Sequence, residues 1–294
     1  MLAHISTVDL TRTTAIPVRT LEPKDPGATR VRVTLLGGFE VSVDDDVIAA
    51  RHWSRRHSSA LVKLLAMSPS RTLHREVVMD TLWPDLAIDD AAPRLHKAAH
   101  YARRILGHRD AVVLLADAVY LWPDGDVHVD MVQFLHLAES AVSSRNMGEA
   151  KRALAVHGGE LLPQDLYEPW ADQHRQHLRR LYIELLRLAE DWHQLLAVDP
   201  AEEPAHLALA RRYADLGDRA AAVRQLDHLD RVMRQELGLQ PSENARELRR
   251  QVFGSAPDRN YVVEPDAGGH DAACSPAATE SRPPCCDLLA GTAR

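Results

Sequence analysis

The strongest constraint on the fold of this 294-residue chain is a change in hydrophobic periodicity near residue 124. Before it, residues 31–48 alternate apolar and polar side chains around Gly37-Gly38, which predicts two short strands, a turn and a third strand. Three segments with helical spacing follow, and residues 111–122 then form two β-rich runs around an Ala-Asp turn. Strands, three helices and a hairpin, in that order, predict a winged helix over residues 30–124.

After this change, every periodic segment from residue 130 to residue 253 has helical spacing. Two stretches can be aligned on their glycines, because Gly148 and Gly217 each follow an alanine by seven residues. The two glycines are 69 residues apart, about twice the 34-residue period of tetratricopeptide helix pairs. The sequence therefore predicts an all-α, tetratricopeptide-like domain over residues 130–253, with a plain antiparallel helical bundle as the alternative.

The two ends of the chain lack such periodicity. Residues 1–29 are predicted to be a flexible lead-in, and residues 255–294, rich in proline, a disordered tail. All three cysteines, Cys274, Cys285 and Cys286, fall in that tail, which predicts no disulfide framework and a reducing compartment. Because no apolar run is long enough for a membrane helix or a secretory signal, we expect a cytoplasmic protein that does not bind membranes.

Positive charge gathers in the third predicted helix, although the chain has a formal net charge of −7. Residues 91–106 carry four Arg or Lys residues and no acidic residue. On a helical wheel, one half of this segment is apolar. The other half carries six candidate DNA-binding residues, namely Arg94, His96, Lys97, His100, Arg103 and Arg104. Arg and Lys suit phosphate contacts, and all three residue types can meet base edges in the major groove. The alternative is an ordinary solvated face.

Catalytic readings find less support in the sequence. His96 and His100 are four residues apart and could together coordinate a zinc ion. However, Lys97 occupies the position where a zinc hydrolase motif has its glutamate. No phosphate loop, dinucleotide-binding motif or nucleophile turn is present in the sequence. We therefore predict no catalytic residue, no metal site, no cofactor and no enzyme activity. The remaining alternative is a helical-repeat adaptor that binds proteins and not DNA, although an adaptor has no reason to keep an acid-free polar face.

Several longer motifs resemble one family of regulators. "VTLLGGFEV", "LVKLLAMSPSRTLHREVVMDTLWPD" and "AAPRLHKAAHYARRILG" resemble the OmpR-like winged helix of the SARP/AfsR-type bacterial transcriptional regulators. "GGELLPQDLYEPWADQHRQHLRRL", "DPAEEPAHLALARRYADLGDRAAAVRQLDHL" and "ELGLQPSENARELRR" resemble their bacterial transcriptional activator domain, which is tetratricopeptide-like. The resemblance covers about residues 31–253.

This resemblance implies a fold and a function. The fold is an α+β winged-helix DNA-binding domain followed by an all-α, tetratricopeptide-like domain. The function is activation of transcription, in which the protein binds repeats in double-stranded promoter DNA and recruits RNA polymerase. The helical domain would support activation and the formation of a homo-oligomer. The recognition helix would be residues 91–106, with Arg55, Arg56 and the hairpin of residues 115–119 as candidate phosphate contacts.

Overall fold

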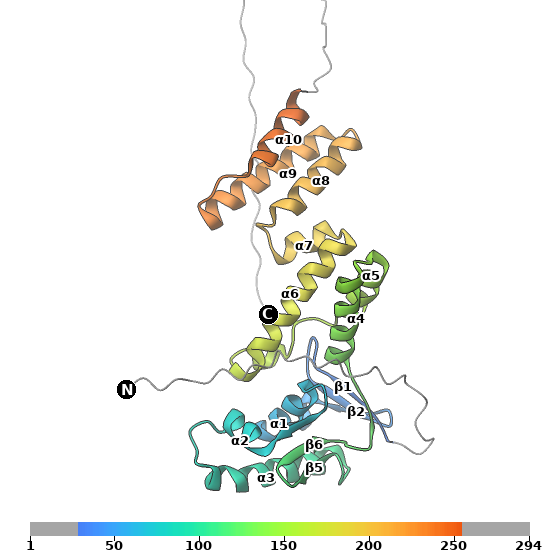
Figure 1. Cartoon of the computed structure of the whole chain (residues 1–294), viewed down its shortest axis with the longest axis vertical. Coiled ribbons are helices and arrows are strands. Elements are labelled where there is room, and N and C mark those ends of the chain that lie inside the picture. Colours follow the sequence, from blue (N-terminus) through green and yellow to red (C-terminus); the bar gives the residue numbers. More distant parts are fainter. Residues whose placement is uncertain (1–28, 255–294) are drawn as a thin grey trace, which may run out of the picture. The chain divides into compact units, whose positions relative to one another are not determined.

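The computed structural model describes residues 29–254 (Figure 1). Residues 1–28 of the predicted flexible segment, and the whole predicted tail with its three cysteines, lie outside the described residues.

A four-stranded sheet opens the described chain, in the order β3-β2-β1-β7. Its strands are β1 (Arg30–Thr34), β2 (Glu40–Val43), β3 (Asp46–Ala49) and β7 (Asp126–Val129). The first three are the predicted strands, and they pair as an antiparallel meander, with Val31 and Val33 buried and Arg32 between them exposed. The sequence did not predict β7, which pairs parallel with β1. The sheet is therefore completed by residues that follow the hairpin by only a few positions.

Three helices and a second sheet follow the meander. The helices are α1 (Arg56–Met67), α2 (Arg75–Leu82) and α3 (Ile88–Leu106), and the sheet has the order β4-β6-β5. Its strands β5 (Val112–Leu115) and β6 (Ala118–Leu121) are the predicted hairpin. The sequence did not predict β4 (Thr72–His74), which pairs with β6. This is the predicted winged-helix order, with one extra strand between α1 and α2.

The start of α3 differs from its prediction. Residues 91–106 were predicted, and the capping preferences of aspartate would favour Asp89 or Asp90 as the cap with Pro93 in the first turn. The helix instead begins at Ile88, after Ala87 as its N-cap. Both aspartates lie in the first turn, where their charge favours the positive end of the helix dipole. Pro93 lies in the second turn and cannot donate a backbone hydrogen bond there.

The rest of the described chain is helical, as predicted. It contains α4 (Asp130–Ser144), α5 (Met147–Ala155), α6 (Pro169–Ala189), α7 (Trp192–Val198), α8 (Glu203–Asp215), α9 (Arg219–Val232) and α10 (Glu243–Gly254). Short helical turns cover Ala50–His52, Pro163–Asp165 and Met233–Leu237. In Figure 1, α4 with α5 and α8 with α9 are neighbouring helix pairs, and contacts join the members of each pair. Consecutive helix pairs are what the glycine spacing predicted. None of the described helices is long and apolar enough to cross a bilayer.

One hydrophobic core extends from Val31 in β1 to Ala189 in α6 and so includes side chains of the winged helix and of α4, α5 and α6. A second core lies within α8, α9 and α10, around Leu226 and Leu248. The division into domains at residues 30–124 and 130–253 stays a prediction. Both segments contribute to the first core.

Asp130, the first residue of α4, fastens that helix to the end of β1. Its Oδ1 atom accepts hydrogen bonds from the N–H groups of Leu35 (2.8 Å) and Met131 (2.7 Å), and its Oδ2 atom accepts one from Leu36 (3.0 Å). Burial raises the pKa of Asp130, and the three backbone donors oppose that rise because they favour the carboxylate. Gly37 then donates a hydrogen bond to the carbonyl of Glu160 at 2.8 Å. The end of β1 is thus held by the helical region.

Candidate nucleic-acid interface

The amphipathic pattern of α3 separates its two faces as expected. The buried side chains are Ala91, Leu95, Ala98, Ala99, Ala102 and Leu106. The small alanines let α3 approach its neighbours closely, and α1 and α2 both contact it. The polar half of the helix therefore faces away from the core.

Five of the six predicted α3 candidates have exposed side chains: Arg94, His96, Lys97, His100 and Arg104. Arg103 differs, because its side chain is half-buried and its Nε–H donates to the carbonyl of Val112 at 2.6 Å. That bond ties α3 to the first strand of the hairpin. A structural contact of this kind depends on a partner outside the helix, so helical spacing alone cannot reveal it.

Arg55 and Arg56 meet α3 at a hollow of about 530 Å³, here called the basic hollow. It is lined by Ser54, Arg55, Arg56, His57, Ser58, Trp83, Arg94, Lys97, Ala98 and Tyr101. The structure thus brings four of the predicted cations together, two from the start of α1 and two from α3. His96, His100, Arg103 and Arg104 do not line this hollow.

The start of α1 adds to the positive potential of the basic hollow. Its N-cap residue, Arg55, makes no side-chain capping bond, and the described first turn carries no acidic residue. The unpaired N–H groups and dipole of a helix N-terminus favour anions. Arg55 is also held in place, because its guanidinium carbon lies 4.0 Å from the centroid of the Tyr101 ring. Together, these features suit a phosphate group.

His57 forms part of the wall of the basic hollow. Its ring stacks on Trp83, with centroids 5.1 Å apart. Burial lowers the pKa of His57, and the positive charges of Arg56 and Arg94 lower it further, whereas the carboxylate of Glu168 acts in the opposite direction. Burial and the neighbouring positive charges therefore favour the neutral form of the imidazole.

Two ion pairs between α1 and the helical region were not predicted from the sequence. Arg56 pairs with Glu168, whose second oxygen accepts a hydrogen bond from Trp170 Nε1–H at 3.0 Å. Deeper in the structure, Lys63 Nζ lies 2.6 Å from Asp165 Oδ2, and only 8% of the Lys63 side chain is exposed. Each pair joins residues more than 100 positions apart. Local patterning carries no information about partners at that separation.

The candidate zinc ligands His96 and His100 both lie exposed on α3. Among residues 29–254, no group of three or more His, Cys, Asp or Glu side chains is arranged to hold a metal ion.

Comparison with known proteins extends these observations. Residues 126–253 match the family model of the bacterial transcriptional activator domain. No curated protein matches the sequence. Among solved structures, the chain is similar to that of Mycobacterium tuberculosis EmbR in complex with a low-affinity phosphopeptide, with 15% sequence identity and a TM-score of 0.56. The similarity covers 78% of this chain and 66% of the EmbR chain, so this chain spans slightly less than two thirds of that relative.

These matches support the predicted architecture. At 15% identity the structural likeness shows the fold alone, and that fold is a winged-helix-like region followed by helices. The family match begins at Asp126, the first residue of β7, and ends at Phe253 in α10. The resemblance found in the motifs is confirmed for this segment.

Proposed function

We propose that the chain is a sequence-specific DNA-binding activator of the SARP type, because residues 126–253 match the model of the bacterial transcriptional activator domain and the motifs before them resemble the winged helix of these regulators. The observation that carries this proposal is the meeting of the acid-free face of α3 with the cationic start of α1 at the basic hollow. In the proposed complex, α3 enters the major groove. Arg55 and Arg56 contact phosphates at the edge of that groove.

The six α3 candidates take different parts in this proposal. Arg94 and Lys97 line the basic hollow and would contact phosphates or the bases next to them. His96, His100 and Arg104 are exposed on α3 and would meet base edges. Arg103 would act mainly by fixing the hairpin against α3. The exposed tip of that hairpin, residues 115–117, would lie along the neighbouring backbone.

The helical region is proposed to serve protein partners. The family resemblance implies that it supports recruitment of RNA polymerase at promoter repeats and the pairing of two copies of the chain. The proposed activity is DNA binding without catalysis or a cofactor. We propose that the protein binds promoter DNA in the cytoplasm. The chain has a net charge of −7, whereas residues 91–106 carry four Arg or Lys residues and no acidic residue, so the α3 side would be attracted to a duplex.

The deciding experiment is selection of binding sites by the full chain from random-sequence duplexes at two salt concentrations. We expect enrichment of a repeated motif. The variants Lys97→Ala and Arg104→Ala should bind it more weakly, and each lost phosphate contact should lower the slope of log affinity against log salt by about 0.9.

The matched control is Lys151→Ala, which removes the same charge from an exposed position on α5, away from α3. It should leave affinity and slope unchanged. Equal affinity and slope for all three variants and the parent protein would contradict the assignment of α3. Absence of any enriched motif would favour the alternative, an adaptor whose helix pairs bind proteins.

A further inference from the structure

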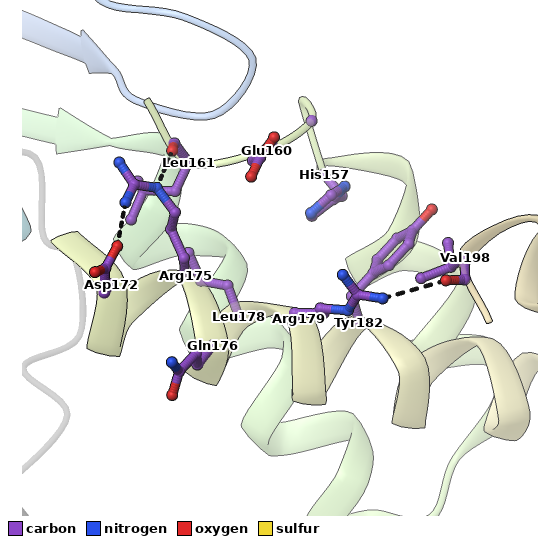
Figure 2. A pocket seen from close by; sticks show the side chains of 11 residues that line it. His157, Glu160, Leu161, Asp172, Arg175, Gln176, Leu178, Arg179, Tyr182 and Val198 are labelled. Carbon is purple, nitrogen blue, oxygen red and sulfur yellow. Dashed lines mark hydrogen bonds and ion pairs between the residues drawn. The ribbon is translucent and has the colours of Figure 1, made fainter. Parts of the chain in front are cut away.

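A second concave site lies in the helical region, where the proposed DNA contacts do not reach. It is a cavity of about 450 Å³ between α6 and the loop of residues 157–161, with Val198 at the end of α7 on one side (Figure 2). This volume falls in the range of small-molecule sites. None of its lining residues belongs to the basic hollow.

One part of the cavity wall is apolar and includes an aromatic ring. Leu161, Leu178 and Val198 contribute aliphatic side chains, and Tyr182 contributes its ring. The Tyr182 ring is fixed because it stacks on His157, with centroids 4.2 Å apart and planes inclined by 20°. Burial lowers the pKa of His157, which favours its neutral imidazole in this stack. Such a wall favours a planar aromatic ring over a flexible chain.

The α6 side of the cavity carries two arginines one turn apart, which do different things. Arg175 is occupied by its own structure, because it donates to the carbonyls of Leu161 (3.1 Å) and Leu166 (3.4 Å) and pairs with Asp172 at 2.6 Å. Its charge is therefore balanced within the wall.

Arg179 keeps unused donors. Its Nη2 atom donates to the carbonyl of Val198 at 3.2 Å, and among the described residues it has no other hydrogen bond or ion pair. Arg179 and Tyr182 both line the cavity from α6, whereas Figure 2 shows the Glu160 carboxylate on the loop side of the cavity. An anionic group would therefore be repelled from the loop side and attracted to Arg179.

We propose that this cavity binds a small planar aromatic anion, with its ring against Tyr182 and Leu178 and its carboxylate on Arg179. The ligand would also contact the loop of residues 157–161. That loop pairs with the winged helix through the bridge between Leu36 and Leu161. A ligand bound in the cavity would therefore contact a loop that is paired with the end of β1.

The test compares two probes that share one ring and differ in charge, indole-3-acetate and tryptamine, by calorimetric titration of the full chain. We expect indole-3-acetate to bind more tightly than tryptamine. The variant Arg179→Gln should raise the dissociation constant of indole-3-acetate about tenfold, because a hydrogen bond to a charged group is lost. Arg180→Gln is the matched control, since Arg180 is its exposed neighbour and does not line the cavity.

A second measurement locates the bound probe. In amide NMR spectra, indole-3-acetate should shift the signals of residues 157–161 and 178–182. Thermal unfolding of Arg179→Gln should match that of the parent protein, and Arg179→Lys should recover part of the lost affinity. No binding at millimolar probe, equal binding by Arg179→Gln and the parent protein, or shifts confined to other residues would each overturn the proposal. None of these measurements involves DNA, so they are independent of the proposed function.

Discussion

At the scale of single residues, Gly37 leaves the least room for a side chain among the described glycines. Its φ angle is +78°, and a Cβ atom there would lie 2.3 Å from the carbonyl oxygen of Gly158. The sequence showed a glycine pair that interrupts two strands, and a turn was predicted there. It could not show that another glycine pair, 158–159, packs against this turn from the helical region. The backbone contact requires small residues on both sides.

Gly37→Ala should therefore destabilise the protein by at least about 3 kcal/mol, because left-handed strain adds to a clash with backbone. Gly107→Ala is the matched control. Gly107 has a φ angle of +70°, but nothing lies within 4 Å of the added Cβ, so we expect a cost of about 1 kcal/mol. Urea unfolding of both variants measures the difference. Equal losses would contradict the close approach of the two segments.

His157 makes folding sensitive to acid. Its ring lies between Phe134 and Tyr182, and burial lowers its pKa below the ordinary value of 6.5. Well above pH 6.5 the folded and unfolded chains both hold this histidine neutral. Below it, the unfolded chain takes up a proton that the folded chain does not, so the free energy of unfolding decreases as pH falls.

The variant His157→Phe keeps the stack and removes the titration. Its free energy of unfolding should fall less steeply between pH 6.5 and pH 5, by up to about 1.4 kcal/mol per pH unit. The difference between the two proteins above pH 7 should be constant, which serves as the internal control. If the free energies of unfolding of the two proteins changed in parallel over the whole pH range, protonation of His157 would not destabilise the folded chain.

At the scale of elements, the sequence predicted those whose signal is contained in their own residues. The periodicity of α3 gave its buried face, and the alternating runs gave β1, β2, β3 and the hairpin. Strands β4 and β7 were missed because each pairs with a strand that is not its neighbour in the sequence, β4 with β6 and β7 with β1. The helix boundary at Ile88 was missed because Asp89 and Asp90 suit a first turn as well as a cap.

Two adjacent arginines of α3 are expected to have different roles, one in the stability of the fold and the other in the proposed contact with DNA. Arg103→Met removes the donor to Val112 O, so the free energy of unfolding should fall by about 2 kcal/mol. Arg104→Met, at an exposed position, should leave stability within about 0.5 kcal/mol of the parent protein and weaken DNA binding. Thermal unfolding and DNA titration of the two variants provide both readouts. A larger stability loss for Arg104→Met would reverse the two assignments.

At the scale of the described chain, the two predicted segments depend on each other more than their sequence patterns suggest. The periodicity change near residue 124 marks where strands give way to helices, but it does not mark where the core ends. Phe134, Leu161 and Leu162 from the helical region belong to the same core as Val33 and Leu61. Cross-segment ion pairs and the strand pairing of β7 with β1 add to this shared packing. Which distant side chains fill one core is settled by tertiary contact, which no local pattern encodes.

This shared core predicts different outcomes for two shortened chains. A chain ending at residue 124 loses β7, the Asp130 carboxylate and the side chains that α4, α5 and α6 contribute to the first core. It also leaves the buried ammonium of Lys63 without Asp165. Because an unpaired buried charge and exposed core side chains both cost free energy, we expect the chain ending at residue 124 not to unfold cooperatively.

A chain ending at residue 200 keeps α4 to α7 and loses α8, α9 and α10, whose main core is their own. It should unfold cooperatively and retain DNA binding. Calorimetry and DNA titration of both chains test this, and a cooperative, DNA-binding chain ending at residue 124 would show that the winged helix folds without the helical region.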